Sequence, residues 1–127
     1  MKFSTKAEYG LKAVVNLAEG YPEIKSLKTI SDEEMISLKY LERLMSSLKE
    51  KGIVKSTKGK MGGYKLAKKP EKITAGDVIE ALDGPIEPMG CSGSNCAKKC
   101  PSSKVWIELE KQMKKTLNKV TLKGLIK

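Results

Sequence analysis

Apolar residues recur every three or four positions along much of this chain, which is the spacing of one face of an α-helix. The first helix is predicted over about Lys6 to Glu19, and one of its faces carries Ala7, Leu11, Val14 and Ala18. Thr5 and Glu8 have the spacing of an N-terminal capping box. Gly20 and Pro22 then end the helix.

Two further helices are predicted, from Leu27 to about Glu34 and from near Ser37 to Gly52. Ser37 is a favoured N-cap residue, and Gly52 can adopt the left-handed conformation that ends many helices. The inward face of the second of these helices carries Leu41, Leu44 and Leu48. Two helices joined by a short turn, with the second one longer and partly basic, indicate a helix-turn-helix unit.

A β-hairpin is predicted directly after this unit, with strands at Ile53–Ser56 and Tyr64–Leu66. The connecting segment, residues 57–63, holds three glycines within five residues, so it can form a tight and exposed turn. A basic hairpin that follows a helix-turn-helix unit is typical of a wing.

The part of the chain after residue 72 is predicted to contain two more helices. The first covers Ile73–Leu82 with Thr74 as its N-cap, and a loop rich in Gly, Ser, Pro and Cys follows over Pro85–Cys100. The last helix, from about Ser102 to Lys119, has an apolar stripe made of Trp106, Leu109, Met113, Leu117 and Val120. A stripe of this length needs a partner, either its own domain or a second copy of the chain. We favour the second copy because the N-terminal part already forms a complete winged domain.

The charge of the chain indicates what kind of partner this fold binds. The net charge is +10, and the stretch from Lys49 to Lys72 alone holds nine lysines against two acidic residues. A basic segment centred on a wing favours a nucleic-acid partner, although a lysine-rich solvated surface is the alternative. No stretch approaches the roughly 20 apolar residues that cross a bilayer. The N-terminus also lacks the apolar run of a secretory signal, so we expect a cytoplasmic protein without membrane contact.

The early, exposed part of the predicted recognition helix is the place where base edges are read in the major groove. We expect double-stranded DNA to be contacted there by Ser37, Lys39, Tyr40, Glu42 and Arg43. From the wing we expect contacts by Lys55, Lys58, Lys60, Gly62 and Gly63. Two alternatives remain open: Glu42 and Arg43 could form a solvated polar face, and Tyr40 could pack at the edge of the core.

Three cysteines, Cys91, Cys96 and Cys100, fall within ten residues of the glycine-rich loop. Thiols with lysines nearby suit either soft-metal binding or redox chemistry. The chain has no histidine, phosphate-binding loop or paired-carboxylate site, so an enzyme is not expected. The cysteines could therefore hold a metal or an iron–sulfur cluster, act as redox thiols without a metal, or have no role.

Four segments, residues 1–10, 37–44, 59–66 and 73–79, together resemble the Rrf-type winged-helix transcription regulators, especially their IscR-like and NsrR-like members. The resemblance covers essentially the whole chain. It implies a mainly α fold: a winged helix-turn-helix domain over residues 1–82, a cysteine-containing sensing loop over 83–101, and a dimerisation helix with its tail over 102–127. It also implies a homodimer that binds a partly palindromic operator, and an iron–sulfur cluster of the 2Fe–2S or 4Fe–4S type on the three cysteines.

Three departures from the pattern matter. Lys58 stands where many members have an arginine, the cysteine loop is shorter than in IscR-like proteins, and Ser103 replaces a histidine ligand. NsrR-like members can take an acidic ligand from the first helix of the other subunit, and Glu8 occupies the equivalent position; its alternative role is the capping box with Thr5. The main hypothesis is a regulator that senses cluster status, redox state or nitric oxide. The alternative is a cofactor-free or thiol-redox DNA-binding regulator controlled by a partner protein.

Overall fold

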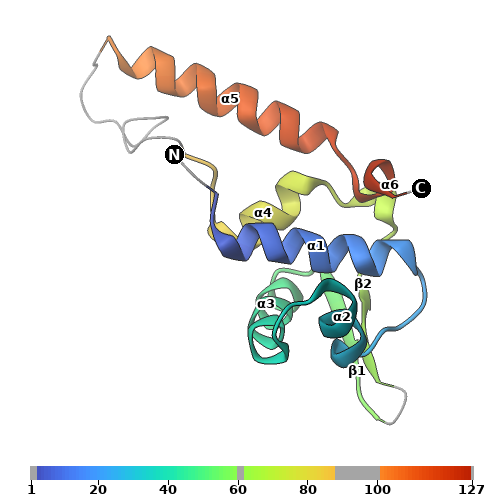
Figure 1. Cartoon of the computed structure of the whole chain (residues 1–127). Coiled ribbons are helices and arrows are strands. Elements are labelled where there is room, and N and C mark those ends of the chain that lie inside the picture. Colours follow the sequence, from blue (N-terminus) through green and yellow to red (C-terminus); the bar gives the residue numbers. More distant parts are fainter. Residues whose placement is uncertain (1–2, 60–61, 88–100, 127) are drawn as a thin grey trace.

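The computed structural model describes residues 3–59, 62–87 and 101–126, and it is mainly helical with one antiparallel hairpin (Figure 1). This confirms the predicted fold class. The elements, in chain order, are α1 (Thr5–Glu19), α2 (Leu27–Glu34), α3 (Leu38–Glu50), β1 (Val54–Thr57), β2 (Gly63–Leu66), the short 3-10 helix η1 (Pro70–Lys72), α4 (Ala75–Asp83), α5 (Ser103–Lys119) and α6 (Leu122–Leu125).

The helix-turn-helix unit forms because one face of α3 is apolar and its two ends are capped as predicted. The Oγ atom of Ser37 accepts a hydrogen bond from the backbone N–H of Tyr40 at 3.2 Å, and Gly52 follows the helix with a φ of +80°. The buried face of the helix comprises Leu41, Leu44, Met45 and Leu48. These side chains share one core with residues of α1 and with Ile30 of α2, which fixes the angle between the helices.

The hairpin pairs Val54 with Leu66 and Thr57 with Gly63 at its two ends, so β1 begins and ends one residue later than predicted. The end of β2 nearest the turn is attached to the loop between α1 and α2. The backbones of Lys25 and Tyr64 exchange two hydrogen bonds, at 2.9 and 2.8 Å. A Cβ atom on Gly63 would lie 2.2 Å from the carbonyl oxygen of Lys25, so only glycine fits at this contact.

The cap of α1 differs from the prediction. Ser4, not Thr5, is the N-cap, and its Oγ atom accepts a hydrogen bond from Ala7 N–H at 3.0 Å. Ser4 also donates through its hydroxyl and its backbone N–H to the carboxylate of Asp83 at the end of α4. The predicted capping box of Thr5 and Glu8 is therefore wrong, because this tertiary contact starts the helix one residue earlier. The capping box on α4, between Thr74 and Asp77, is present.

Helix α5 packs against its own domain through its C-terminal half. Met113 and Leu117 contact a small cluster formed by Ala7, Ile79 and Ile86. The chain then turns back, and Leu122 is completely buried in the main core. Figure 1 shows the other end of α5 extending away from the rest of the domain. The alternative in which the apolar stripe folds onto its own domain therefore holds for half of the helix.

Candidate nucleic-acid interface

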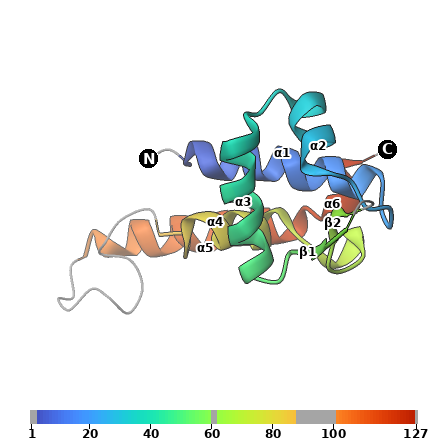
Figure 2. The ribbon, with the colours of Figure 1, turned by 90° about the horizontal axis from the view of Figure 1, so that it is seen from below.

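The recognition helix and the wing lie on the same side of the molecule. Figure 1 places α3 and the hairpin at the bottom, opposite α5, and Figure 2 views the domain from that side. The exposed side chains at the start of α3 include those of Ser37, which caps it, and of Lys39, Glu42 and Arg43. Four of the five predicted α3 contacts are thus exposed, and Lys39, Glu42 and Arg43 have the spacing of one helix face, as reading bases in a groove requires.

Tyr40 is the fifth predicted contact, and it is only partly exposed. Its ring packs edge-on against the ring of Tyr9 on α1, with 5.9 Å between centroids and an interplanar angle of 88°. The side chain also packs on the main core. The alternative of packing at the core edge is therefore correct for the ring, and a DNA contact by Tyr40 stays a prediction.

On the wing, Lys55 and Lys58 are exposed on the hairpin, whereas Lys60 falls outside the described residues. Gly62 and Gly63 have evident structural roles. A Cβ atom on Gly62 would lie 2.4 Å from the carbonyl oxygen of Thr57 within the turn, and Gly63 contacts Lys25. These contacts explain the two glycines without DNA, so their predicted DNA contacts remain untested.

A polar cluster that the sequence reasoning missed connects α1, α2 and the wing. Asn16 is only 6% exposed, and its Nδ2 atom donates to Glu33 Oε1 at 3.1 Å and to Glu34 Oε2 at 2.7 Å. Lys25 Nζ donates to Asn16 Oδ1 at 2.7 Å and to Glu33 Oε1 at 2.9 Å. We call these four residues the Asn16 cluster. A polar residue amid the apolar face of α1 was the sequence signal for it.

The Asn16 cluster also favours the ionised form of the Glu33 carboxyl. The hydrogen bond from Lys25, and then that from Asn16, hold the pKa of the Glu33 carboxyl below its usual value. Because the backbone of Lys25 pairs with Tyr64 on β2, the cluster joins the helix-turn-helix unit to the wing. It therefore positions the two proposed DNA-contacting elements relative to each other.

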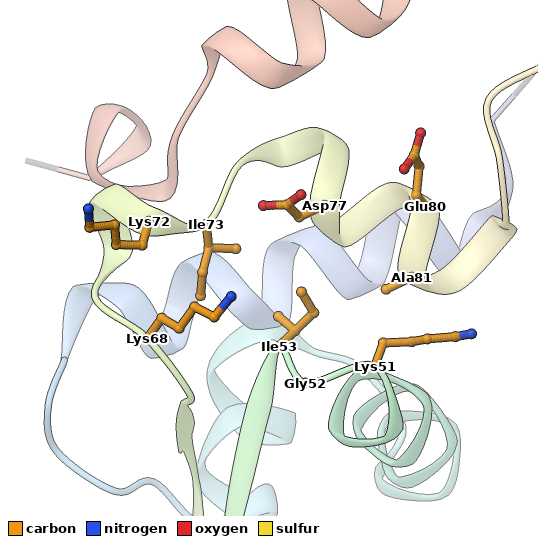
Figure 3. A pocket seen from close by; sticks show the side chains of 9 residues that line it. All are labelled: Lys51, Gly52, Ile53, Lys68, Lys72, Ile73, Asp77, Glu80 and Ala81. Carbon is orange, nitrogen blue, oxygen red and sulfur yellow. The ribbon is translucent and has the colours of Figure 1, made fainter.

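A hollow of about 320 Å³ lies behind the recognition helix, between its C-terminal end and α4 (Figure 3). Its lining includes the apolar residues Ile53, Ile73 and Ala81, and its charged lining residues are Lys51, Lys68, Lys72, Asp77 and Glu80. Figure 3 shows the charged ends of Lys72, Glu80 and Lys51 well apart rather than converging on one point. Within the described ranges, no group of three or more Cys, Asp or Glu side chains could hold a metal ion.

The predicted cysteine site falls largely outside the described residues, because Cys91, Cys96 and Cys100 lie in the segment 88–100. The chain enters this segment beside the N-terminus of α1, where Ile86 packs with Ala7. Glu8 is exposed on α1, and Ser103 is 9% exposed at the start of α5. With Ser4 as the cap, the Glu8 carboxylate has no capping role.

Two shallow apolar hollows lie on the surfaces of α5 and α1. One of about 290 Å³ is lined by Phe3, Gln112, Met113, Thr116 and Leu117. The other, of about 440 Å³, is lined by Glu8, Leu11, Lys12, Val15, Glu19, Glu34 and Leu125. Three large apolar side chains on the extended half of α5 are also exposed: Val105 (59%), Ile107 (40%) and Leu109 (41%). None of the described helices is long and apolar enough to cross a membrane.

Comparison with known proteins identifies the family of this chain. Residues 3–127 match the family model Rrf2, which is described as an iron-dependent transcriptional regulator. The HTH-type transcriptional regulator CymR of Bacillus subtilis (strain 168) is 41% identical over 127 residues, covering 98% of this chain and 89% of CymR. The HTH-type transcriptional regulator IscR of Escherichia coli O1:K1 / APEC is 34% identical over 132 residues, covering 99% of this chain and 80% of IscR.

The fold is shared with a solved relative. The structure of CymR, described as the global cysteine regulator of B. subtilis, superposes with a TM-score of 0.85 and 38% identity, covering 98% of this chain and 95% of that chain. The matched relatives are transcription regulators by name, which supports DNA binding rather than catalysis. The match covers the recognition helix, the wing and the long C-terminal helix alike, and the chain belongs to the Rrf2 family of winged-helix transcription regulators.

Proposed function

We propose that this protein is a homodimeric transcription regulator that binds a partly palindromic DNA operator through α3 and the wing. The observation that carries the proposal is the shared exposed surface of Lys39, Glu42 and Arg43, with the wing, on which Lys55 and Lys58 are exposed, on the same side of the molecule. Arg43 can bond a guanine through two N–H groups, and Glu42 can accept from a cytosine amino group. The wing lysines suit phosphate contacts, which supply affinity without sequence preference.

The dimer is proposed to form through the extended half of α5. Val105 and Leu109 lie one helical turn apart and are both exposed, although the same helix buries Met113 and Leu117 against its own domain. The hollow beside Phe3 continues this apolar surface along α5. A second copy that covers it would remove apolar area from water and place two recognition helices on successive half-sites.

The sensing site is proposed to be an iron–sulfur cluster on Cys91, Cys96 and Cys100, with a carboxylate oxygen of Glu8 of the partner subunit as the fourth ligand. Three thiolates suit iron and leave one coordination position for an oxygen. Two observations support Glu8: its side chain is exposed, and the cap of α1 is supplied by Ser4. Ser103 is buried, and its hydroxyl would have to lose a proton to bind well.

Such a cluster, when bound, would supply a centre whose state changes with oxygen, nitric oxide or iron supply. The residues of this chain would transmit the change, because Ile86, just before the cysteine segment, packs on Ala7 of α1. From α1 the Asn16 cluster continues to α2 and, through Lys25, to strand β2 of the wing. A shift of the segment that contains Ile86 would therefore act on the DNA-contacting elements through α1.

A second candidate is a thiol-redox regulator without a cofactor. It is favoured by the 41% identity to CymR, because the solved CymR is described as a global cysteine regulator. In that case the three cysteines would respond through disulfide formation or a partner protein. Both candidates share the same DNA-binding domain.

Anaerobic purification separates the two. A cluster predicts a brown protein with visible charge-transfer absorbance, and with iron and acid-labile sulfide that are both lost in Cys96→Ala. The Glu8→Ala variant should bind a cluster that decays faster in air, whereas Lys12→Ala on the same exposed part of α1 should behave as wild type. A colourless wild type after anaerobic reconstitution would refute the cluster and leave the thiol-redox regulator.

A further inference from the structure

The first turn of α3 presents an apolar side chain among the exposed polar residues Ser37, Lys39 and Glu42. Leu38 is the first residue of the helix, directly after the N-cap Ser37, and it is 40% exposed. The buried apolar residues of α3 begin one turn later, at Leu41. Leu38 is thus a large apolar residue at the end of the helix that a helix-turn-helix unit inserts into the major groove.

Leu38 lies on the same face as Glu42, because residues four apart on a helix are neighbours. The axial rise between them is about 6 Å, which corresponds to roughly two base-pair steps of about 3.4 Å each. Leu38 and Glu42 therefore form one continuous surface, with an isobutyl group next to a carboxylate. That surface could read a short run of adjacent base pairs.

We propose that Leu38 is a specificity-determining residue that recognises the C5-methyl group of a thymine in each half-site. The inference deepens the proposed function and rests on it. The methyl group of thymine is the only apolar feature that a base pair presents in the major groove, and apolar side chains contact it there. The carboxylate of Glu42 would face a cytosine amino group within about two base pairs of that thymine.

The chemistry of the side chain and its neighbours favours contact between Leu38 and a base over contact with a phosphate. An isobutyl group gains nothing from a phosphate, whereas each neighbouring exposed side chain on this surface can form hydrogen bonds. Met35, in the turn before α3, is another exposed apolar residue, 91% accessible and in the left-handed conformation with a φ of 57°. It precedes the helix, so it serves as a matched control rather than as a reader.

The test replaces thymine by uracil, which removes only the methyl group. An operator is first selected from a pool of random duplexes with the wild-type protein, and then each thymine is replaced in turn and affinity is measured by fluorescence anisotropy. Loss of one buried methyl contact should weaken binding about fourfold per half-site, and about fifteenfold when both half-sites are changed. Leu38→Ala should bind the thymine and uracil duplexes equally, Leu38→Met should restore the difference, and Met35→Ala should keep it.

The outcomes separate this inference from the function on which it rests. A wild type that selects an operator but tolerates uracil at every position would overturn the role of Leu38 and leave the regulator intact. The same holds if Leu38→Ala keeps the full uracil sensitivity, since another group would then read the methyl. A wild type that selects no operator would overturn the proposed function, and this inference with it.

Discussion

Removing the side chain of Asn16 is the perturbation that most directly tests how the DNA-contacting elements are held together. Asn16 is 6% exposed and takes part in three hydrogen bonds, all to charged partners. A hydrogen bond to a charged group contributes about 1.5–3 kcal/mol when buried. Here Glu33 and Glu34 keep access to water, so each lost bond should cost less. We expect Asn16→Ala to lower the free energy of unfolding by about 2 kcal/mol.

The assay is urea unfolding followed by the helical circular dichroism signal, at a fixed protein concentration because a dimer is proposed. Lys28→Ala is the matched control, since it breaks the exposed Lys28–Asp32 pair on neighbouring α2 at 3.0 Å. That control should cost about 0.5 kcal/mol or less. Hydrogen exchange at the amides of Lys25 and Tyr64 should also become faster in Asn16→Ala. Equal stabilities of the two variants would refute the positioning role of the cluster.

The remaining predictions concern the wing, the dimer and pH. The double variant Lys55→Ala, Lys58→Ala should reduce the slope of log affinity against log salt concentration by about 0.9 per lost phosphate contact on any duplex. The control Lys123→Ala should leave this slope unchanged. An unchanged slope in the double variant would show that the wing does not touch the DNA backbone. The double variant Val105→Asp, Leu109→Asp should give folded monomers by light scattering, because both side chains are exposed in the single subunit. A mass equal to that of the wild-type dimer would contradict the α5 dimer. Met113→Asp should instead destabilise the fold, since Met113 packs on its own domain. Because the folded pKa of Glu33 is lowered, its ionised carboxyl stabilises the fold above the unfolded pKa, and this stability is lost as pH falls through the folded pKa. Glu33→Gln should therefore be less stable than wild type near neutral pH, and the difference in stability should shrink towards acid pH. A difference that does not depend on pH would contradict the assigned cause.

Much of the fold could be predicted because local signals and burial agree. On α3 the apolar spacing, the cap at Ser37 and the left-handed Gly52 all indicate the same helix, and the structure has it there. The hairpin was predicted from the glycines of its turn, although strand β1 begins one residue later than predicted. Only pairing decides which residue opens a short strand.

The incorrect or missed features depend on contacts between distant segments. Ser4 and Thr5 are both good caps, and the bond from Ser4 to Asp83 on α4 selects the first. The stripe on α5 shows that the helix has an apolar face but not what covers it. Half of it packs on the domain through Met113. The Asn16 cluster needs Lys25, a residue positioned by its backbone pairing with Tyr64, which no periodicity reveals.

The central claim, that α3 reads DNA sequence, is tested most directly by comparing Arg43→Ala with wild type on a selected operator and on a scrambled duplex. Arg43 is the only arginine in the chain and lies exposed on α3. If it reads a guanine, the variant should lose about 1–3 kcal/mol of affinity for the operator and little for the scrambled duplex. The wild type should prefer the operator by about a thousandfold or more. Equal losses on both duplexes, or a wild type without preference, would contradict the account.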